Sequence, residues 1–283
     1  MTSHLSRRLA FAFTLPALVA IAPFVAACLY ILRFSLSGEQ GVIEGFSLTP
    51  YYELLTPYFG RSVWITLKLS LIATSVVIVL AVPLALVLVT LQSNLARRLL
   101  TVTILLPLIL NLLVQAYGWV LLLGPSGVVN STLIALGLTD RPVRLMFNET
   151  GVLLGLIQTS LPLAVFPIAS SVRSISSEYL EAASSLGATH WRSFRDITLP
   201  LLRPGLVAAA SIVFAFNASA FAIPLILGGR RVQMVGLAVR DMISPLFNWS
   251  GAAAGGMVLI LLTIFVLFAS NYLVRKTTAR IGT

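Results

Sequence analysis

The residue types that most often catalyse reactions or bind metals are scarce in this chain. It holds two histidines (His4 and His190), one cysteine (Cys28) and two lysines (Lys68 and Lys276). A zinc site or a Cys–His nucleophile needs several such residues placed together, and a P-loop needs a lysine directly after a glycine-rich turn. We therefore expect no catalytic residue, no metal site and no bound ATP in this chain, so any chemistry belongs to a partner.

The segment with the clearest local pattern is 176–200, which reads SSEYLEAASSLGATHWRSFRDITLP. Ser177 and Thr189 stand where their hydroxyls could cap two short helices. Gly187, between them, can turn the chain through a positive φ, and Pro200 is expected to end or bend the second helix. The segment therefore predicts a pair of short helices between two long apolar stretches.

The side chains of this helix pair suit contact with another protein. Ala182, Ala183 and Gly187 are small enough to let a partner surface approach closely, and Trp191 and Phe194 are candidate anchors. The alternative is an amphipathic loop that merely lies on the membrane surface.

The spacing of residues in this loop resembles the EAA loop of ATP-binding-cassette (ABC) importer permeases. In that family the loop forms a coupling helix, which sits in a groove of the cytoplasmic ATPase subunit and carries its closing motion into the membrane. The resemblance implies that the matching residues contact an ATPase, which would bind ATP and Mg in place of this chain. These residues are Glu181, Ala182, Ala183, Gly187, Ile197, Leu199 and Pro200.

Three further segments, 138–147, 161–167 and 248–254, are similar to the first permease of spermidine/putrescine-type importers. The same branch includes permeases for opines, phosphonates and other small amines or acids. The resemblance covers about residues 66–274 and implies a type I fold, with a five-helix core and an extra first helix. It also implies two ATPase subunits, a second permease (a paralogue or a second copy) and a periplasmic or external solute-binding protein.

Composition independently predicts an all-α, polytopic membrane protein. Apolar residues make up 58% of the chain and charged residues 10%, against about 25% charged in soluble domains. The net charge of +10 would suggest nucleic acid in a soluble protein, but here the basic residues flank apolar stretches, so we expect a lipid bilayer and no nucleic acid. One permease domain, 1–283, is expected to hold six spans: 9–32, 63–91, 99–123, 151–172, 206–227 and 254–274.

An even number of spans puts both termini on one side of the membrane. The 19 basic residues divide eleven to eight in favour of that side, which predicts cytoplasmic termini and a cytoplasmic loop 176–200 in a bacterial inner membrane. Val25-Ala-Ala-Cys28 resembles a lipoprotein processing site. Because the first apolar run of 24 residues exceeds a signal-peptide core of about 7–15, we expect an uncleaved first helix.

Polar residues inside the predicted spans are candidates for a translocation path. No aspartate or glutamate lies deep in a span, which disfavours a proton- or sodium-coupled carrier. Each polar side chain needs a partner in hydrocarbon, so each either lines the path or makes a packing hydrogen bond between helices. The candidates are Asn111, Gln115, Tyr117, Gln158 and Asn217.

Together these features predict a permease subunit of an ATP-driven importer that moves a small solute, a polyamine or a related small organic amine or acid. The alternative is a stand-alone secondary transporter or a channel. An inverted repeat or a midplane carboxylate would favour the transporter, and a filter-like ring would favour the channel. We see none of these in the sequence.

Overall fold

A computed structural model describes the backbone of residues 2–38 and 45–279, and the side chains of these residues except 2–15, 17 and 271–279. Every regular element in that part of the chain is a helix. The side chains of His4 and Lys276 and the outer ends of the predicted spans 9–32 and 254–274 lie outside the described side chains. Residues 1–59 with 238–258, and residues 60–237 with 259–283, form two compact units, which are described separately.

The first unit contains the helix α1 (Thr2–Ser35), which continues without a break through Val25–Cys28. Cys28 is exposed. The Ser35 hydroxyl and the Tyr51 hydroxyl share a hydrogen bond of 2.8 Å, which joins α1 to the short helix α2 (Thr49–Glu53). The unit also holds most of α12 (Val235–Ile243) and the first part of α13 (Trp249–Ala279).

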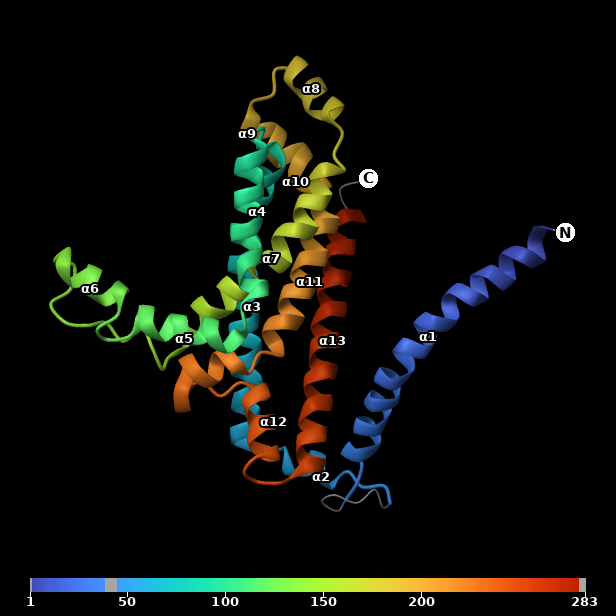
Figure 1. Cartoon of the computed structure of the whole chain (residues 1–283), viewed down its shortest axis with the longest axis vertical. Coiled ribbons are helices and arrows are strands. Elements are labelled where there is room, and N and C mark those ends of the chain that lie inside the picture. Colours follow the sequence, from blue (N-terminus) through green and yellow to red (C-terminus); the bar gives the residue numbers. More distant parts are fainter. Residues whose placement is uncertain (1, 39–44, 280–283) are drawn as a thin grey trace. The chain divides into compact units, whose positions relative to one another are not determined.

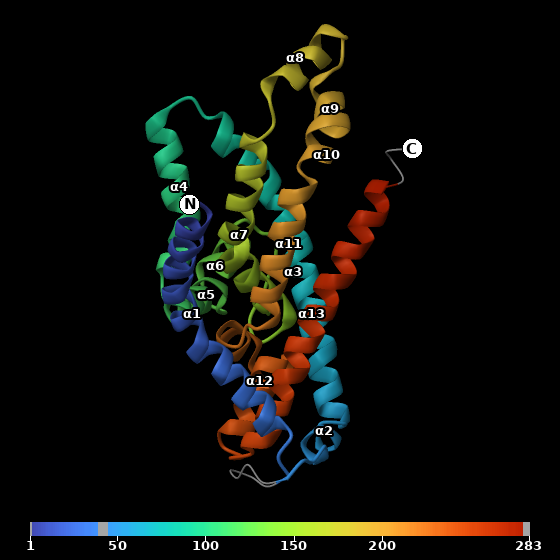
Figure 2. The ribbon, with the colours of Figure 1, turned by 90° about the vertical axis from the view of Figure 1, so that its right-hand side faces the viewer.

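The second unit is a helical bundle organised around α7 (Glu149–Arg173). In Figures 1 and 2, α7 and α11 run side by side, and α7 also packs against α4, α5 and the π-helix η2 (Pro224–Gly228). The loop with α8 extends beyond one end of this bundle. The other helices of the unit are α3 (Pro57–Thr90), α4 (Asn94–Ile109), α5 (Leu112–Leu123), α6 (Val128–Ala135) and α11 (Arg203–Ala218).

The core of the second unit is a stripe of apolar side chains along α3. Residues four apart share a helix face, and the stripe shows this spacing without a gap. Its small members let neighbouring helices approach closely, as is typical of helix packing in membranes. The fully buried residues of the stripe are Leu69, Ala73, Val77, Ala81 and Ala85, and they pack into clusters with Leu156, Val165, Ile168, Val213 and Met234.

Five helical stretches among the described residues are long and apolar enough to cross a membrane. A sixth is added if the pair 190–201 and 203–218, bent by 63°, is one span. The five are Leu18–Ser35, Pro57–Thr90, Leu112–Ala135, Glu149–Arg173 and Trp249–Ser270. The expected all-helical, multi-pass class is confirmed, although the boundaries of individual spans differ.

The predicted third span, 99–123, is two helices rather than one. α4 ends at Ile109, Leu110 is extended (ψ 141°), and α5 begins after Asn111. Pro107 and the capping side chain of Asn111 account for the break, because proline weakens the helix and asparagine favours a helix start.

The predicted fifth span, 206–227, is also interrupted. α11 ends at Ala218, and the chain continues through a turn into the π-helix η2, which begins at Pro224. Non-helical backbone at membrane depth is tolerated where protein or a water-filled cavity surrounds it.

An ion pair joins α3 to the start of α7. Lys68 Nζ donates to Glu149 Oε2 at 2.6 Å, with side-chain exposures of 39% and 42%. We expect Lys68→Met to lower the melting temperature of the detergent-solubilised protein by a few degrees, because half-exposed pairs contribute up to about 1 kcal/mol.

Lys68→Glu and Glu149→Lys should each lower the melting temperature as well, and the exchange variant that combines them should recover part of the loss. It cannot restore all of it, because a lysine at position 149 faces the positive end of the α7 dipole. Thermal unfolding of both single variants and the exchange variant measures the coupling. If the loss of the exchange variant equals the sum of the two single losses, the ion pair does not stabilise the fold.

Candidate functional site

The loop beyond the end of α7 forms two short helices, as the sequence predicts. The first, α8, spans Ser177–Ser185, and its cap is Ser176, whose hydroxyl accepts from the Glu178 amide at 3.3 Å. The prediction of Ser177 as the cap was wrong by one residue, because two consecutive serines offer the same hydroxyl. Glu178 lies in the first turn, where the helix dipole favours a negative charge.

Gly187 ends α8 in a left-handed conformation, with φ of +78°. The Gly187 amide donates to the Ser184 carbonyl at 2.9 Å, and the Ala188 amide donates to the Ala183 carbonyl at 3.0 Å. This pair of bonds is the Schellman arrangement, in which glycine carries the positive φ without steric cost. The predicted turn at Gly187 is therefore confirmed.

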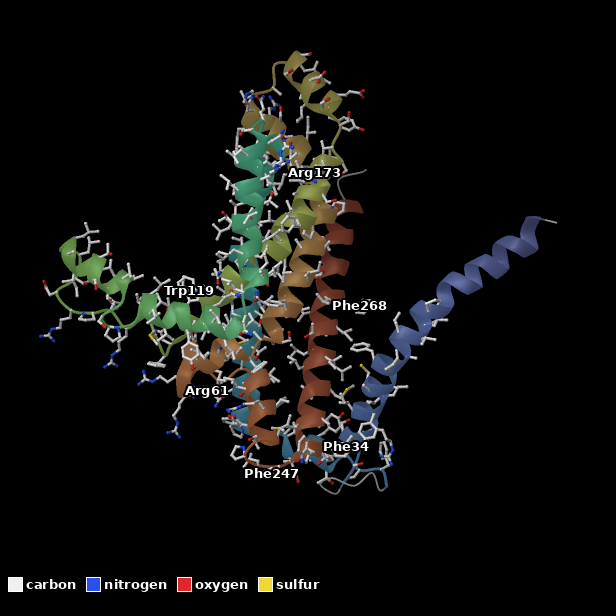
Figure 3. All side chains as sticks on the ribbon, viewed as in Figure 1. Phe34, Arg61, Trp119, Arg173, Phe247 and Phe268 are labelled. Atoms are coloured by element: carbon white, nitrogen blue, oxygen red, sulfur yellow. The ribbon has the colours of Figure 1, made fainter. Side chains whose placement is uncertain are left out.

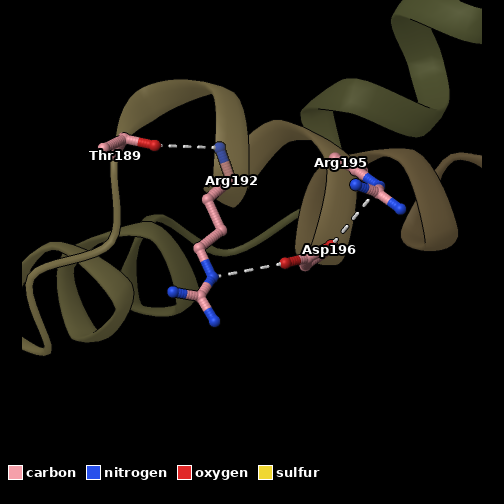
Figure 4. Close-up of polar contacts among 4 residues, drawn as sticks. All are labelled: Thr189, Arg192, Arg195 and Asp196. Atoms are coloured by element: carbon pink, nitrogen blue, oxygen red, sulfur yellow. Dashed lines mark hydrogen bonds and ion pairs between the residues drawn. The ribbon is translucent and has the colours of Figure 1, made fainter.

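Thr189 caps the second helix, α9 (His190–Ser193), by accepting from the Arg192 amide at 3.3 Å (Figure 4). The π-helix η1 (Phe194–Thr198) and α10 (Leu199–Leu201) follow, and the chain then bends into α11. The predicted cap at Thr189 and the bend near Pro200 are both confirmed.

Asp196, in η1, lies between Arg192 of α9 and Arg195 of η1. Its carboxylate is 3.7 Å from Arg192 and 4.0 Å from Arg195 (Figure 4). All three side chains are more than half exposed, and exposed pairs contribute little stability. The triplet therefore presents charge on the loop surface more than it stabilises the loop.

The loop exposes large apolar side chains that a solvated loop would bury. Leu186 is 88% exposed and Trp191 71% exposed, and the Trp191 ring lies 5.7 Å from that of Phe194. Tyr179, which sequence reasoning missed, is also exposed. An exposed apolar patch with a polar rim is typical of a protein–protein contact.

The predicted coupling residues occupy different depths in this loop. Ala183 is buried, and its carbonyl accepts the Ala188 amide at the turn. Its small side chain therefore fits inside the loop and offers little surface to a partner. Ile197 and Pro200 are half-buried. Exposed members of the set are Glu181, Ala182, Gly187 and Leu199.

Two of the candidate path residues hold the break between α4 and α5. The Asn111 side chain accepts from the Leu113 amide at 2.8 Å. Gln115 Nε2 donates to the carbonyls of Pro107 and Leu110 at 2.5 and 2.9 Å, which the break leaves without helical partners. This geometry favours the packing alternative for Gln115, whereas Asn111 caps its own helix.

A second polar contact links α5 to α7. Trp119 Nε1 donates to Gln158 Oε1 at 3.3 Å, and Tyr117 on α5 is 62% exposed. Figure 3 shows Trp119 on α5, toward the end of the bundle opposite Arg173 and α8.

Asn217, on α11, is fully buried, and its Nδ2 atom donates to the Ser160 hydroxyl of α7 at 3.3 Å. Its Oδ1 atom has no hydrogen-bond partner in the structure. A cavity of about 150 Å³ is lined by Thr159, Phe216 and Ser219 among others, and Asn217 itself does not line it. A buried acceptor without a partner is costly, so Oδ1 keeps a hydrogen-bonding capacity that the described residues do not use.

Comparison with known proteins agrees with this architecture. Residues 78–279 match the family model described as "Binding-protein-dependent transport system inner membrane component". The "Spermidine/putrescine transport system permease protein PotB" of Haemophilus influenzae is 31% identical over 229 residues, which cover 80% of each chain. The "Molybdenum transport system permease protein ModB" of Azotobacter vinelandii is 30% identical over 212 residues, covering 73% of this chain and 92% of ModB.

Solved structures show the same fold. A chain of the bacterial alginate ABC transporter, in complex with an alginate pentasaccharide-bound periplasmic protein, superposes with a TM-score of 0.79 at 21% identity and covers 95% of both chains. A chain of the inward-facing MetNI methionine ABC transporter gives a TM-score of 0.59 at 18% identity, over 80% of this chain and 97% of that one. The chain therefore belongs to the binding-protein-dependent transport system inner membrane components: it is a multi-pass inner-membrane permease subunit of an ABC importer, whose ATPase is a separate component.

Proposed function

We propose that this chain is one of two permease subunits in the importer, and that its loop 176–200 engages one of two ATPase subunits. The observation that carries the proposal is the exposed apolar surface of α8 and α9, around Leu186 and Trp191, on a loop with the EAA spacing. The second permease is a paralogue or a second copy of this chain. Family membership favours this importer over a stand-alone secondary transporter or a channel.

The exposed part of the loop that an ATPase groove would cover has two small residues, Ala182 and Gly187, and one carboxylate, that of Glu181. Ala183 shapes the turn from inside. Ile197, Leu199 and Pro200 lie where the second helix joins α11, so they would pass the displacement of the loop to the bundle.

The same arrangement implies an orientation. The coupling loop and both termini would face the cytoplasm, because six spans, with α11 counted as one of them, would separate the termini and basic residues are more numerous on that side. The start of α7, about 37 Å away at 1.5 Å per residue, would then face outward.

The path for solute would run past Tyr117, Gln158 and Asn217, while Asn111 and Gln115 hold the helix break beside it. α7 and α11 flank the coupling loop in sequence and pack against each other. A displacement of the loop would therefore move these two helices, which carry Gln158 and Asn217. Such a change requires a ligand with different affinities for the two states, and ATP bound to the ATPase subunits supplies that difference.

The solute would be a small organic molecule delivered by a solute-binding protein. PotB is named for spermidine and putrescine, and ModB for molybdenum. By similarity to PotB we assign this permease a polyamine or a related small organic amine or acid.

Affinity purification tests the proposal. The tagged chain, extracted gently from its native membrane, should carry an ATPase subunit and a second permease, both identified by mass spectrometry. Leu186→Glu should release the ATPase, because it places a charge where an apolar contact is expected. Leu138→Glu, a matched change of an exposed leucine outside the coupling loop, should not. A chain that purifies alone and moves solute without ATP contradicts the proposal.

A further inference from the structure

A cavity of about 890 Å³ lies at the end of α7 opposite the coupling loop. Its walls come mainly from two segments far apart in the sequence, 141–147 before α7 and 229–231 after η2. The volume falls within the range of about 300–1,000 Å³ that is typical of small-molecule sites. None of the residues discussed for coupling lines it.

Unusual backbone conformations hold the two walls together. Phe147 has a φ of +57° and Gly229 a φ of +55°. The Phe147 amide donates to the Leu227 carbonyl at 2.8 Å, and a Cβ atom on Gly229 would lie 3.0 Å from the Phe147 ring. A bulky residue at positive φ is rare, and such strain persists where the surrounding structure over-determines it. The cavity is therefore a built feature of the fold.

Four arginines contribute to the walls of this cavity: Arg141, Arg144, Arg230 and Arg231. All four are exposed to solvent, so their guanidinium groups can reach a ligand at the cavity. Within the described side chains, none of them forms an ion pair with a carboxylate. The arginine fork matches carboxylate and phosphonate groups with two parallel hydrogen bonds. The same four charges repel a cation.

The carboxylates near these walls do not offset that charge. Glu149 follows the first wall in sequence, but it is paired with Lys68. Asp140 precedes Arg141 and is exposed, with no ion pair in the described structure. A polyamine would therefore meet an excess of positive charge, whereas an anion would be concentrated there.

The cavity is connected in sequence to the proposed path. Ser219 to Ile223, which follow Asn217 in the sequence, line the small cavity. After η2 the same stretch of chain reaches Gly229, Arg230 and Arg231 in the large cavity. In a path that follows this stretch of chain, the arginines would come before Asn217. The large cavity would thus form the outer mouth of the path.

We propose that this arginine pocket binds a small organic anion bearing carboxylate or phosphonate groups, and that such an anion, rather than a polyamine, is the solute. The apolar wall of Leu145, Met146 and Phe147 would contact its carbon skeleton. The inference rests on the proposed function, and it selects the organic acid from the solute classes left open there.

Isothermal titration calorimetry on the purified permease–ATPase complex, without binding protein, tests the pocket with citrate, phosphonoacetate and spermidine as probes. At least one of the anions should bind and spermidine should not. The double variants Arg141→Gln/Arg144→Gln and Arg230→Gln/Arg231→Gln should each weaken anion binding about tenfold or more, since each removes hydrogen bonds to a charged group. Arg98→Gln, an exposed arginine at the start of α4, should leave binding unchanged.

Failure of the anion site is distinguishable from failure of the proposed function. Spermidine binding that strengthens in the double variants, or no anion binding at millimolar concentration, overturns the anion site while the ATPase still co-purifies. The double variants could also keep anion binding and lose only the stimulation of ATP hydrolysis by the binding protein. That result would mean that the arginines contact the binding protein, and it would also overturn the solute site. Absence of the ATPase from the wild-type preparation contradicts the proposed function itself.

Discussion

Replacing Gly187 by aspartate is expected to reduce ATP-driven uptake to background while the permease remains folded and inserted. Gly187 adopts a φ of +78°, and a Cβ atom there meets nothing within 4 Å. The local cost is therefore about 1 kcal/mol of backbone strain, which a packed bundle can absorb. The new carboxylate would stand on the surface that the ATPase groove is proposed to cover, where a buried unpaired charge is strongly unfavourable.

Gly137 supplies a matched control for this experiment. It also has a positive φ, +67°, and a Cβ atom added there would likewise meet nothing within 4 Å, but it lies between α6 and α7, away from the coupling loop. Gly137→Asp should leave uptake and ATPase co-purification near wild-type values. Proteoliposome uptake, ATP hydrolysis and detergent thermal unfolding of both variants form the measurement. Equal loss of uptake in the two would mean that strain, rather than docking, disables the protein.

The coupling loop could be predicted closely because its determinants are local. A positive-φ glycine and a hydroxyl cap each act within a few residues, and both Gly187 and Thr189 behave as their types indicate. The cap of α8 was misplaced by one residue because Ser176 and Ser177 are equivalent in the sequence.

The helix break at Leu110 was not predicted, although its determinants were present. Proline is common in membrane helices, so Pro107 alone did not mark an end, and the hydropathy of 99–123 is uniformly apolar. Asn111 and Gln115 are four residues apart, a spacing that indicates one shared face of a continuous helix. The structure instead uses Asn111 as a cap and Gln115 as a donor to freed carbonyls.

Contacts between distant segments could not be predicted from one sequence. Lys68 and Glu149 are 81 residues apart, and Trp119 and Gln158 are 39 apart. The same holds for the arginine pocket, because its two walls meet only through the fold. In the sequence, those arginines appeared as basic residues on the outer side and nothing more.

Replacing Asn217 by leucine is expected to lower uptake about tenfold with little change in stability. The substitution keeps the branching at Cγ and removes both polar atoms of the amide, and an apolar replacement of similar shape can be nearly neutral for folding. Ser160 is not orphaned, because its hydroxyl still donates to the Leu156 carbonyl at 2.6 Å. The loss of uptake would come from the Oδ1 atom, which has no hydrogen-bond partner among the described residues and would accept one from solute or water when the path opens.

Ser160→Ala separates the two roles that the sequence left open for Asn217. It removes the acceptor of the Asn217 Nδ2 hydrogen bond but leaves Oδ1 in place. If Asn217 only packs α11 against α7, both variants lose the same hydrogen bond, worth about 1 kcal/mol, and should show similar melting temperatures and similar uptake. If Asn217 lines the path, Ser160→Ala should transport near the wild-type rate while Asn217→Leu does not. Uptake and thermal unfolding, both measured on the two variants, therefore decide between packing and transport. Only a role in the path predicts that uptake differs between the variants by more than their melting temperatures explain.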